Sequence, residues 1–340
     1  MLKALAILLL TAAAPVCSIP VFRYALERWR TAPYPGVLFH QGPLSADARA
    51  LLKEIDASGL NVAIEAVDVA GSLSDEHRKL RGDAPLPQLV LAYPDQPEAV
   101  AWRGAFSAES VKALIDSPRR RETIRLLTSG TSVVWWLFES GDAAKDVAAA
   151  ELLTKELARL EKEIKIPVPG PDDPPLRSAV PLKVAFTLLR VPKDPGGEAA
   201  FRETLSRARR DWSLPAAVPV FGRGRALGSL CGSEINADYV TRMAEYVTDA
   251  CSCEVKELNP GVDLLFAADW EELLDAGPAP PEPEVKAPPV ALQIPKAAAP
   301  AAPAVPPASP APSRYLLWAG LGAALLVAVA AGAAAFRKAS

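Results

Sequence analysis

Three cysteines late in the chain have the residue type and spacing for chemistry. Cys251 and Cys253 form a Cys-x-Cys pair, and Cys231 lies upstream at the end of a predicted strand. In an oxidising compartment, Cys231 and one member of the pair can form a structural disulfide. A strained Cys-x-Cys bond can instead exchange electrons with other thiols, and thiolates can bind a soft metal such as Cu(I) or Zn(II).

Metal sites of this kind usually recruit histidine or methionine as well, and the chain has two of each. We therefore favour the disulfide, followed by thiol exchange, and predict no metal site and no cofactor. The histidines, His40 and His77, have no serine or cysteine nucleophile pattern beside them, and a triad of distant residues has no positive support. Gly222-Arg223-Gly224-Arg225 lacks the Lys-Ser/Thr ending of a phosphate loop and is predicted to be a hairpin turn.

The C-terminal hydrophobic run predicts a membrane anchor. Tyr315 to Phe336 is uncharged and about 22 residues long, which is enough to cross a bilayer core as a helix. The basic residues Arg337 and Lys338 follow it, and such residues favour the cytoplasmic side. The lipid bilayer is therefore one expected partner of this chain.

The N-terminus has the layout of a secretory signal peptide. Lys3 is followed by an apolar stretch and by the small residues Ala12 to Ala14, after which cleavage is expected at Ala14 or a little later. The alternative is an uncleaved N-terminal anchor. Cys17 is preceded by Pro15 and Val16, which makes a poor lipidation site. Export and a C-terminal span together predict a single-pass membrane protein with its head outside the cytoplasm.

Composition bears on the remaining partners. The formal net charge of −3 argues against nucleic acid, which requires a concentrated basic surface. The basic clusters Arg119 to Arg121 and Arg207 to Arg210 are interpreted as solvated helix faces. From Ala276 to Ser313 the chain is mainly Pro, Ala and Val, which cannot form a core and prefers extended conformations. This disordered stalk could reach on the order of 100 Å.

The first half of the head alternates predicted strands and helices. Ser45 can cap the first long helix, and Gly59 can end it. Strands are expected over 36–40, 61–67, 86–93 and 100–104, and helices over 45–58, 74–80 and 107–115, after an extended piece and helix within 19–29.

This β-α-β-α-Pro-β-β-α order, with Pro87 leading a strand and Trp102-Arg103-Gly104 before the last helix, resembles the thioredoxin fold. The resemblance implies a cis peptide bond at Pro87. It also implies a Cys-x-x-Cys after the first strand, where a helix N-terminus lowers the thiol pKa. That place reads Gln41 to Ala46 and has no cysteine, so the shape is implied without the redox chemistry.

The second half repeats the pattern more weakly, and another small α/β domain is the alternative. Ser140-Gly141-Asp142 stands where a Cys-x-x-Cys would be, and Pro219 is the second candidate for a cis-proline. Trp135 and Trp136 are expected to face opposite sides of one strand. The predicted strands are 132–138, 182–189, 220–221, 225–230 and 262–267, and the helices are 142–164, 198–210 and 238–248.

The segments CSIPVFRYALERW, VFGRGRAL, CSC and NPGVDLL resemble an uncharacterised family of exported bacterial membrane-anchored proteins, which implies no activity. We expect a membrane-tethered binding or scaffold protein without catalytic activity that contacts a protein partner. The alternative is a protein that handles thiols or soft metals through Cys231, Cys251 and Cys253. The expected α/β organisation is a signal peptide (1–18), two tandem thioredoxin-like domains (19–128 and 129–275), a linker (276–313) and a transmembrane helix (315–336).

Overall fold

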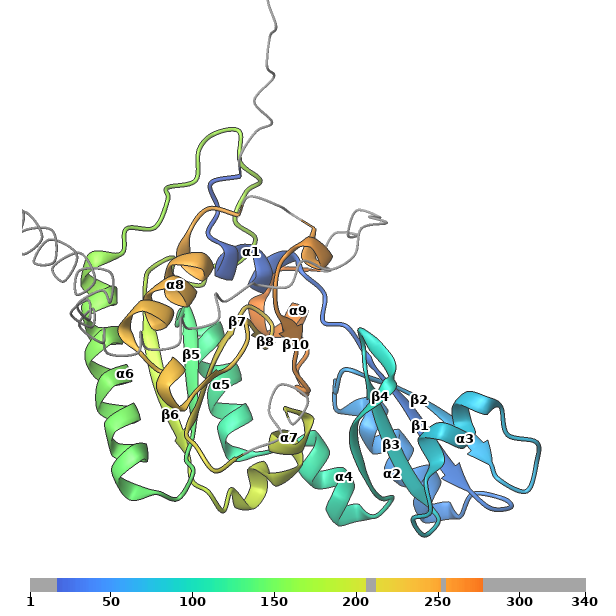
Figure 1. Ribbon diagram of the computed structural model, residues 1–340. Coiled ribbons are helices and arrows are strands. Elements are labelled where there is room, and N and C mark those ends of the chain that lie inside the picture. Colours follow the sequence, from blue (N-terminus) through green and yellow to red (C-terminus); the bar gives the residue numbers. More distant parts are fainter. Residues whose placement is uncertain (1–16, 206–211, 252–254, 278–340) are drawn as a thin grey trace, which may run out of the picture. The chain divides into compact units, whose positions relative to one another are not determined.

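The computed structural model describes residues 17–205, 212–251 and 255–277, which belong to one compact unit of the chain. These residues form a mixed α/β structure with two sheets, as the sequence predicts (Figure 1). Within these ranges, no helix combines the length and the apolar character needed to cross a bilayer. Most of the predicted signal peptide, the stalk beyond Gly277, the 315–336 span, Arg207 to Arg210 and Cys253 lie outside the described residues.

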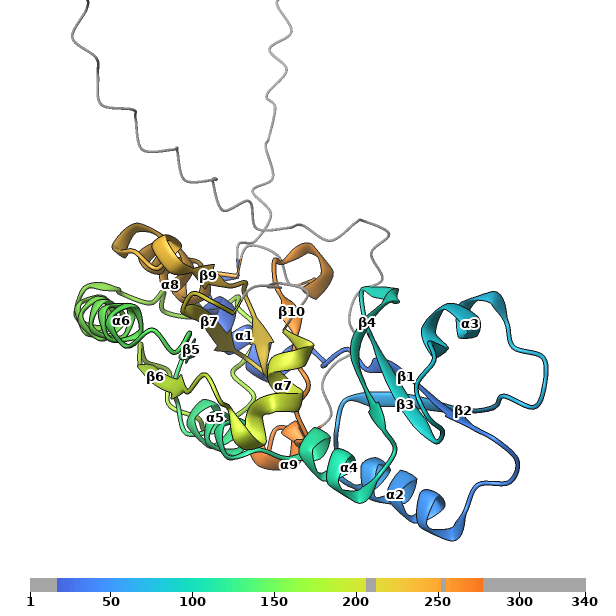
Figure 2. The ribbon, with the colours of Figure 1, turned by 60° about the horizontal axis from the view of Figure 1, so that its bottom comes forward.

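The first sheet has the order β2-β1-β3-β4. β1 pairs in parallel with β2 and antiparallel with β3, and β3 pairs antiparallel with β4. Helices α2 and α4 cover one face of this sheet and α3 the other (Figure 2). Its elements are β1 (Tyr34–His40), α2 (Ala46–Ala57), β2 (Val62–Asp68), α3 (Asp75–Arg81), β3 (Gln88–Tyr93), β4 (Gln96–Ala105) and α4 (Ala108–Ile115).

The second sheet has the order β10-β8-β7-β5-β6, with β9 also pairing with β7. β5 pairs in parallel with β6 and antiparallel with β7. Trp135 and Trp136 are both fully buried, in the core clusters on opposite faces of this sheet, as predicted. Its elements are β5 (Val133–Phe138), α6 (Ala143–Glu163), β6 (Phe186–Val191), η1 (Gly196–Glu198), α7 (Ala199–Thr204), β7 (Ala216–Phe221), β8 (Arg225–Ala226), β9 (Leu230–Cys231), η2 (Gly232–Glu234), α8 (Ala237–Thr248), η3 (Lys256–Leu258), β10 (Val262–Asp263) and α9 (Trp270–Leu274).

Local signals set the helix starts that the sequence predicts. The Ser45 hydroxyl accepts a hydrogen bond from the Ala48 N–H at 3.1 Å and caps α2. The Asp142 carboxylate accepts from the Lys145 N–H at 3.3 Å and caps α6. Each cap satisfies one of the backbone donors that a helix N-terminus leaves without a partner.

Two helices within residues 19–128, the first predicted domain, pack with the second sheet. Every residue of α1 (Val21–Arg28) is buried, and the helix packs against α8 and β7 (Figure 1). Leu127 of α5 (Pro118–Thr128) lies in the core cluster that contains Trp136. The reason is long-range pairing: Pro20 bridges to Ala250, which holds the N-terminal segment against residues far along the chain.

The turn at Gly222-Arg223-Gly224-Arg225 joins β7 to β8, as predicted for a hairpin. Gly222 has φ +57°, and a Cβ there would lie 2.6 Å from the Cβ of Ala25, so α1 packs directly on this turn. The predicted strand over 262–267 is shorter, because residues after β10 bond to loops. The Leu264 N–H donates to the Gly224 carbonyl at 2.9 Å, and the Phe266 N–H donates to the Asn61 side chain at 2.9 Å.

Candidate ligand pocket at the junction of the two sheets

The structure separates the two predicted thiol partners that it describes. Cys231 ends β9 and packs against the core cluster that contains Trp136. Cys251 follows α8 and is buried in the cluster that contains Trp135, on the other face of the sheet. The structure therefore has no Cys231–Cys251 bond, and the predicted alternative, Cys231–Cys253, involves a residue outside the described ranges. Within the described ranges no three His, Cys, Asp or Glu side chains are grouped to hold a metal ion.

The two candidate cis-prolines differ. The Leu86–Pro87 peptide bond is cis. Pro219 is not at a cis bond, and it does not lead a strand: it lies inside β7, paired with Trp135. The proline that matches Pro87 in position is Pro215, because it directly precedes β7 as Pro87 precedes β3.

A shared hydrogen bond supports this equivalence of the two prolines. The Phe106 N–H donates to the Pro87 carbonyl, and the Gly232 N–H donates to the Pro215 carbonyl, both at 2.9 Å. Both prolines follow a leucine and precede a buried strand, so the repeated Leu-Pro dipeptide is the sequence signal that could have located Pro215.

The loops that follow the first strand of each sheet, Gln41 to Ala46 and Ser140 to Asp142, are held by carboxylates. The loop after β1 contains Gly42, whose N–H donates to the carboxylate of Asp68 at the end of β2. Asp68 also accepts from the Ala70 N–H, and the hydrogen bonds from Ala70 and Gly42 lower the pKa of its carboxyl group. After β5, the Asp146 carboxylate accepts from the Ser140 N–H, the Ser140 hydroxyl and the Gly141 N–H, each at 2.8 Å. These contacts fix both loops without a thiol.

A pocket of about 320 Å³ lies where the two sheets meet. The first sheet contributes the rings of Tyr34 and Tyr93, whose centroids are 6.4 Å apart. The second contributes β8, η3 and β10. The Tyr34 hydroxyl donates to the Asp263 carbonyl at 2.9 Å and so links the two sheets directly. The lining residues are Ala32, Tyr34, Tyr93, Pro94, Asp95, Arg225, Lys256, Glu257, Gly261, Val262 and Asp263.

A buried charged cluster forms one wall of this pocket. The Asp263 carboxylate lies 2.9 Å from Arg225 Nη1 and 3.2 Å from Lys256 Nζ, and it also accepts from the Ala32 N–H at 2.7 Å. Burial by itself raises the pKa of Asp263, but the attraction of Arg225 and Lys256 and these hydrogen bonds outweigh it, so the net shift is downward. The Arg225 guanidinium also lies 5.7 Å from the centre of the Trp29 ring.

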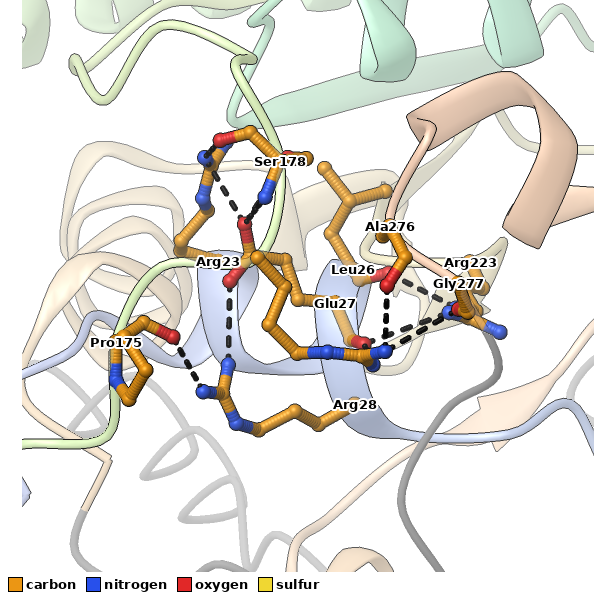
Figure 3. A network of polar contacts seen from close by, with 10 residues as sticks. Arg23, Leu26, Glu27, Arg28, Pro175, Ser178, Arg223, Ala276 and Gly277 are labelled. Atoms are coloured by element: carbon orange, nitrogen blue, oxygen red, sulfur yellow. Dashed lines mark hydrogen bonds and ion pairs between the residues drawn. The ribbon is translucent and has the colours of Figure 1, made fainter.

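A second buried polar network surrounds α1 (Figure 3). The Glu27 side chain is fully buried, and its carboxylate lies 3.0 Å from Arg23 and 3.1 Å from Arg28. The same carboxylate accepts from the N–H and hydroxyl of Ser178 at 2.8 and 3.0 Å. Nε and Nη1 of Arg23 have no hydrogen-bond partner among the described residues, and burial lowers the pKa of Arg23.

Further arginines attach the neighbouring segments to α1. Arg177 donates to the Glu27 carbonyl at 2.8 Å and to the Ala276 carbonyl at 2.6 Å. Arg223 donates to the Leu26 carbonyl at 2.8 Å (Figure 3). The network therefore holds the helix, the 164–185 connection and the end of the described chain together, and we interpret it as structural.

The prediction that Arg119 to Arg121 form a solvated helix face is wrong for Arg120. Its side chain is buried, and its guanidinium donates to the carbonyls of Ala113, Leu114 and Leu265 at 2.6, 2.6 and 3.3 Å. Burial lowers the pKa of Arg120 to about 10, against the opposing attraction of Glu198. Arg120, Thr123 and Leu127 share one helix face, and this spacing is the signal that could have revealed the burial.

Comparison with protein-family models gives no match for this chain, and comparison with proteins of known function gives none either. The geometry of the molecule must therefore carry any proposal about its role. Of the features described above, the junction pocket combines a concave shape, aromatic walls and a few placed charges. Those are the usual properties of a ligand site.

Proposed function

We propose that this protein is a membrane-tethered extracytoplasmic binding protein without catalytic activity, and that its ligand or partner enters the junction pocket. The observation that carries the proposal is the composition of that pocket. Its walls come from both sheets, with two tyrosine rings on one side and the Arg225–Asp263–Lys256 cluster on the other. A group bound there would contact both halves of the head at once.

We further propose that the head is a pair of thioredoxin-like modules. The strands β2-β1-β3-β4 of the first sheet and β6-β5-β7-β8 of the second follow one order, with the same parallel and antiparallel pairings. In each half a proline directly precedes the third strand, and a helix follows the last of these strands along the chain. This is the order of elements on which the resemblance to thioredoxin rests.

The charged groups of the pocket already have hydrogen-bond and ion-pair partners, which favours a role in ligand binding over a role in catalysis. Arg225 donates to the Asn259 carbonyl at 2.9 Å as well as to Asp263, and Asp263 has three partners. Charges that are paired in this way are poorly placed to act as an acid, base or nucleophile. They can still orient a ligand whose apolar part packs on Tyr34 and Tyr93.

The tether is proposed from sequence alone, through the signal-like start, the Pro/Ala-rich stalk and the 315–336 span. The described chain supports one part of it. Arg177 bonds to the carbonyls of Ala276 and Gly277, at 2.6 and 3.2 Å, and so anchors the chain where the stalk would begin. A head anchored at that point is suited to presenting its pocket to a partner outside the cell membrane.

Blocking the pocket should abolish the specific association. Val262 lines the pocket and is 40% exposed, so Val262→Trp places a large ring at its mouth without changing the buried cluster. Val100, in β4, is 37% exposed and does not line the pocket, which makes Val100→Trp a matched control. The measurement is quantitative mass spectrometry of molecules that co-purify with each full-length protein from membranes.

We expect at least one component that the wild type and Val100→Trp retain equally and that Val262→Trp loses by about tenfold or more, which corresponds to about 1.4 kcal/mol of binding free energy. Equal thermal melting of the two variants would show that both heads are folded. Equal co-purification with both variants would contradict the proposed pocket.

A further inference from the structure

The N-terminal segment lies directly beside the residues that follow α8. Pro20 and Ala250 form an antiparallel bridge. The Val21 N–H donates to the Asp249 carbonyl at 3.0 Å, and the Cys251 N–H donates to the Ile19 carbonyl at 2.9 Å. These two hydrogen bonds place Ile19 opposite Cys251 in the ladder.

Two cysteines are buried beside this contact. Ile19 and Cys251 are buried in the same core cluster, at 0% and 1% exposure. Cys17 precedes Ile19 by two residues and is 7% exposed in the same cluster. A disulfide between Cys17 and Cys251 needs an α-carbon separation of about 4.4–6.8 Å.

We infer that the exported chain keeps Cys17 and that a disulfide joins Cys17 to Cys251. This assignment requires signal cleavage before Cys17, earlier than the predicted boundary at residue 18, and Cys17 then pairs with Cys251 in place of Cys231. The oxidant is a protein or small-molecule disulfide of the extracytoplasmic space. One cysteine thiolate attacks that disulfide and releases one thiol; the other thiolate then displaces the second, so two protein thiols become one disulfide and the oxidant becomes two thiols.

The bond would close a very long loop, because it joins the first described residue to one near the end of the head. Loop closure on this scale restricts the unfolded chain strongly. Reduction should therefore lower the melting temperature of the head by about 5–15 °C. The inference is independent of the junction pocket, which lies among other residues.

The test uses full-length protein extracted from membranes with an alkylating agent present and digested without reductant. A second sample is reduced and then oxidised with oxidised glutathione, which makes the pairing observable whatever compartment the protein came from. The variants are Cys17→Ser and, as a matched control, Cys231→Ser. We expect a Cys17–Cys251 peptide in both samples. Dithiothreitol should lower the melting temperature of the wild type and of Cys231→Ser, and leave that of Cys17→Ser unchanged.

Several results would overturn the inference. These are a mature N-terminus beyond Cys17, a lipid on Cys17, alkylation of both thiols in the glutathione sample, or a bond from either cysteine to Cys231 or Cys253. The two proposals can fail independently. The co-purifying component can be lost in Val262→Trp while the Cys17–Cys251 peptide is present, or it can be retained equally in both tryptophan variants while that peptide is absent.

Discussion

Glu27→Gln should lower the free energy of unfolding by about 3–5 kcal/mol, because it leaves two buried arginines without their counter-charge. Arg23 and Arg28 both pair with the Glu27 carboxylate, and none of the three side chains is more than 7% exposed. Glutamine keeps the size of the side chain and can still accept from Ser178. The loss therefore reports the charge and not a cavity.

The measurement is urea unfolding of the head, followed by tryptophan fluorescence. Glu122→Gln is the matched control, since Glu122 pairs with Arg125 on the exposed face of α5 at 37% and 63% exposure. Such a surface pair contributes at most about 1 kcal/mol. Equal effects of the two substitutions would refute the structural role assigned to Glu27.

Asp263→Asn should have an effect of the same size, about 3–5 kcal/mol, because Arg225 and Lys256 would remain buried around a neutral side chain. Asp75→Asn is the control: Asp75 pairs with Arg78 on α3 and is 83% exposed. The wall of the pocket would also lose its negative charge. Asp263→Asn should therefore lose the same co-purifying component that Val262→Trp loses, even at temperatures where the Asp263→Asn protein is folded.

The pH dependence of this effect has a definite sign. The pKa of Asp263 is lowered in the folded protein, so the stability that it contributes is present above the unfolded value of about 3.9. That stability is lost as the pH falls through the lower, folded-state pKa. The difference between wild type and Asp263→Asn should be constant from about pH 7 to 5 and shrink below about pH 4. A difference that grows on acidification would contradict the charged cluster.

Local patterns predicted much of the fold. The caps at Ser45 and Asp142, the alternation at Trp135 and Trp136, and the proline before β3 each depend on residues close in sequence. The position of α1 was not predictable in this way. Nothing within 19–29 indicates that the segment bridges to Ala250 and packs with the second sheet.

The pocket could not be predicted from local patterns either, because its lining residues are far apart in the sequence. Tyr34, Tyr93, Arg225 and Asp263 come from four separate segments, and each belongs to an ordinary strand or strand end when considered alone. The charge cluster forms only when β8 and β10 pair, with Asp263 opposite Arg225. Likewise, the basic run that contains Arg120 has the composition of a surface, and only its helical phase distinguishes the buried member.

The proposal depends above all on the placement of the head outside the cytoplasm. Protease added to intact spheroplasts should cleave the chain between the head and the 315–336 span, and antibody against the C-terminal peptide should then detect only a short membrane-bound fragment. A cytoplasmic marker must stay intact in the same sample, and lysed cells must show the same cleavage. Full-length protein that survives in spheroplasts and is cleaved only after lysis would contradict the account.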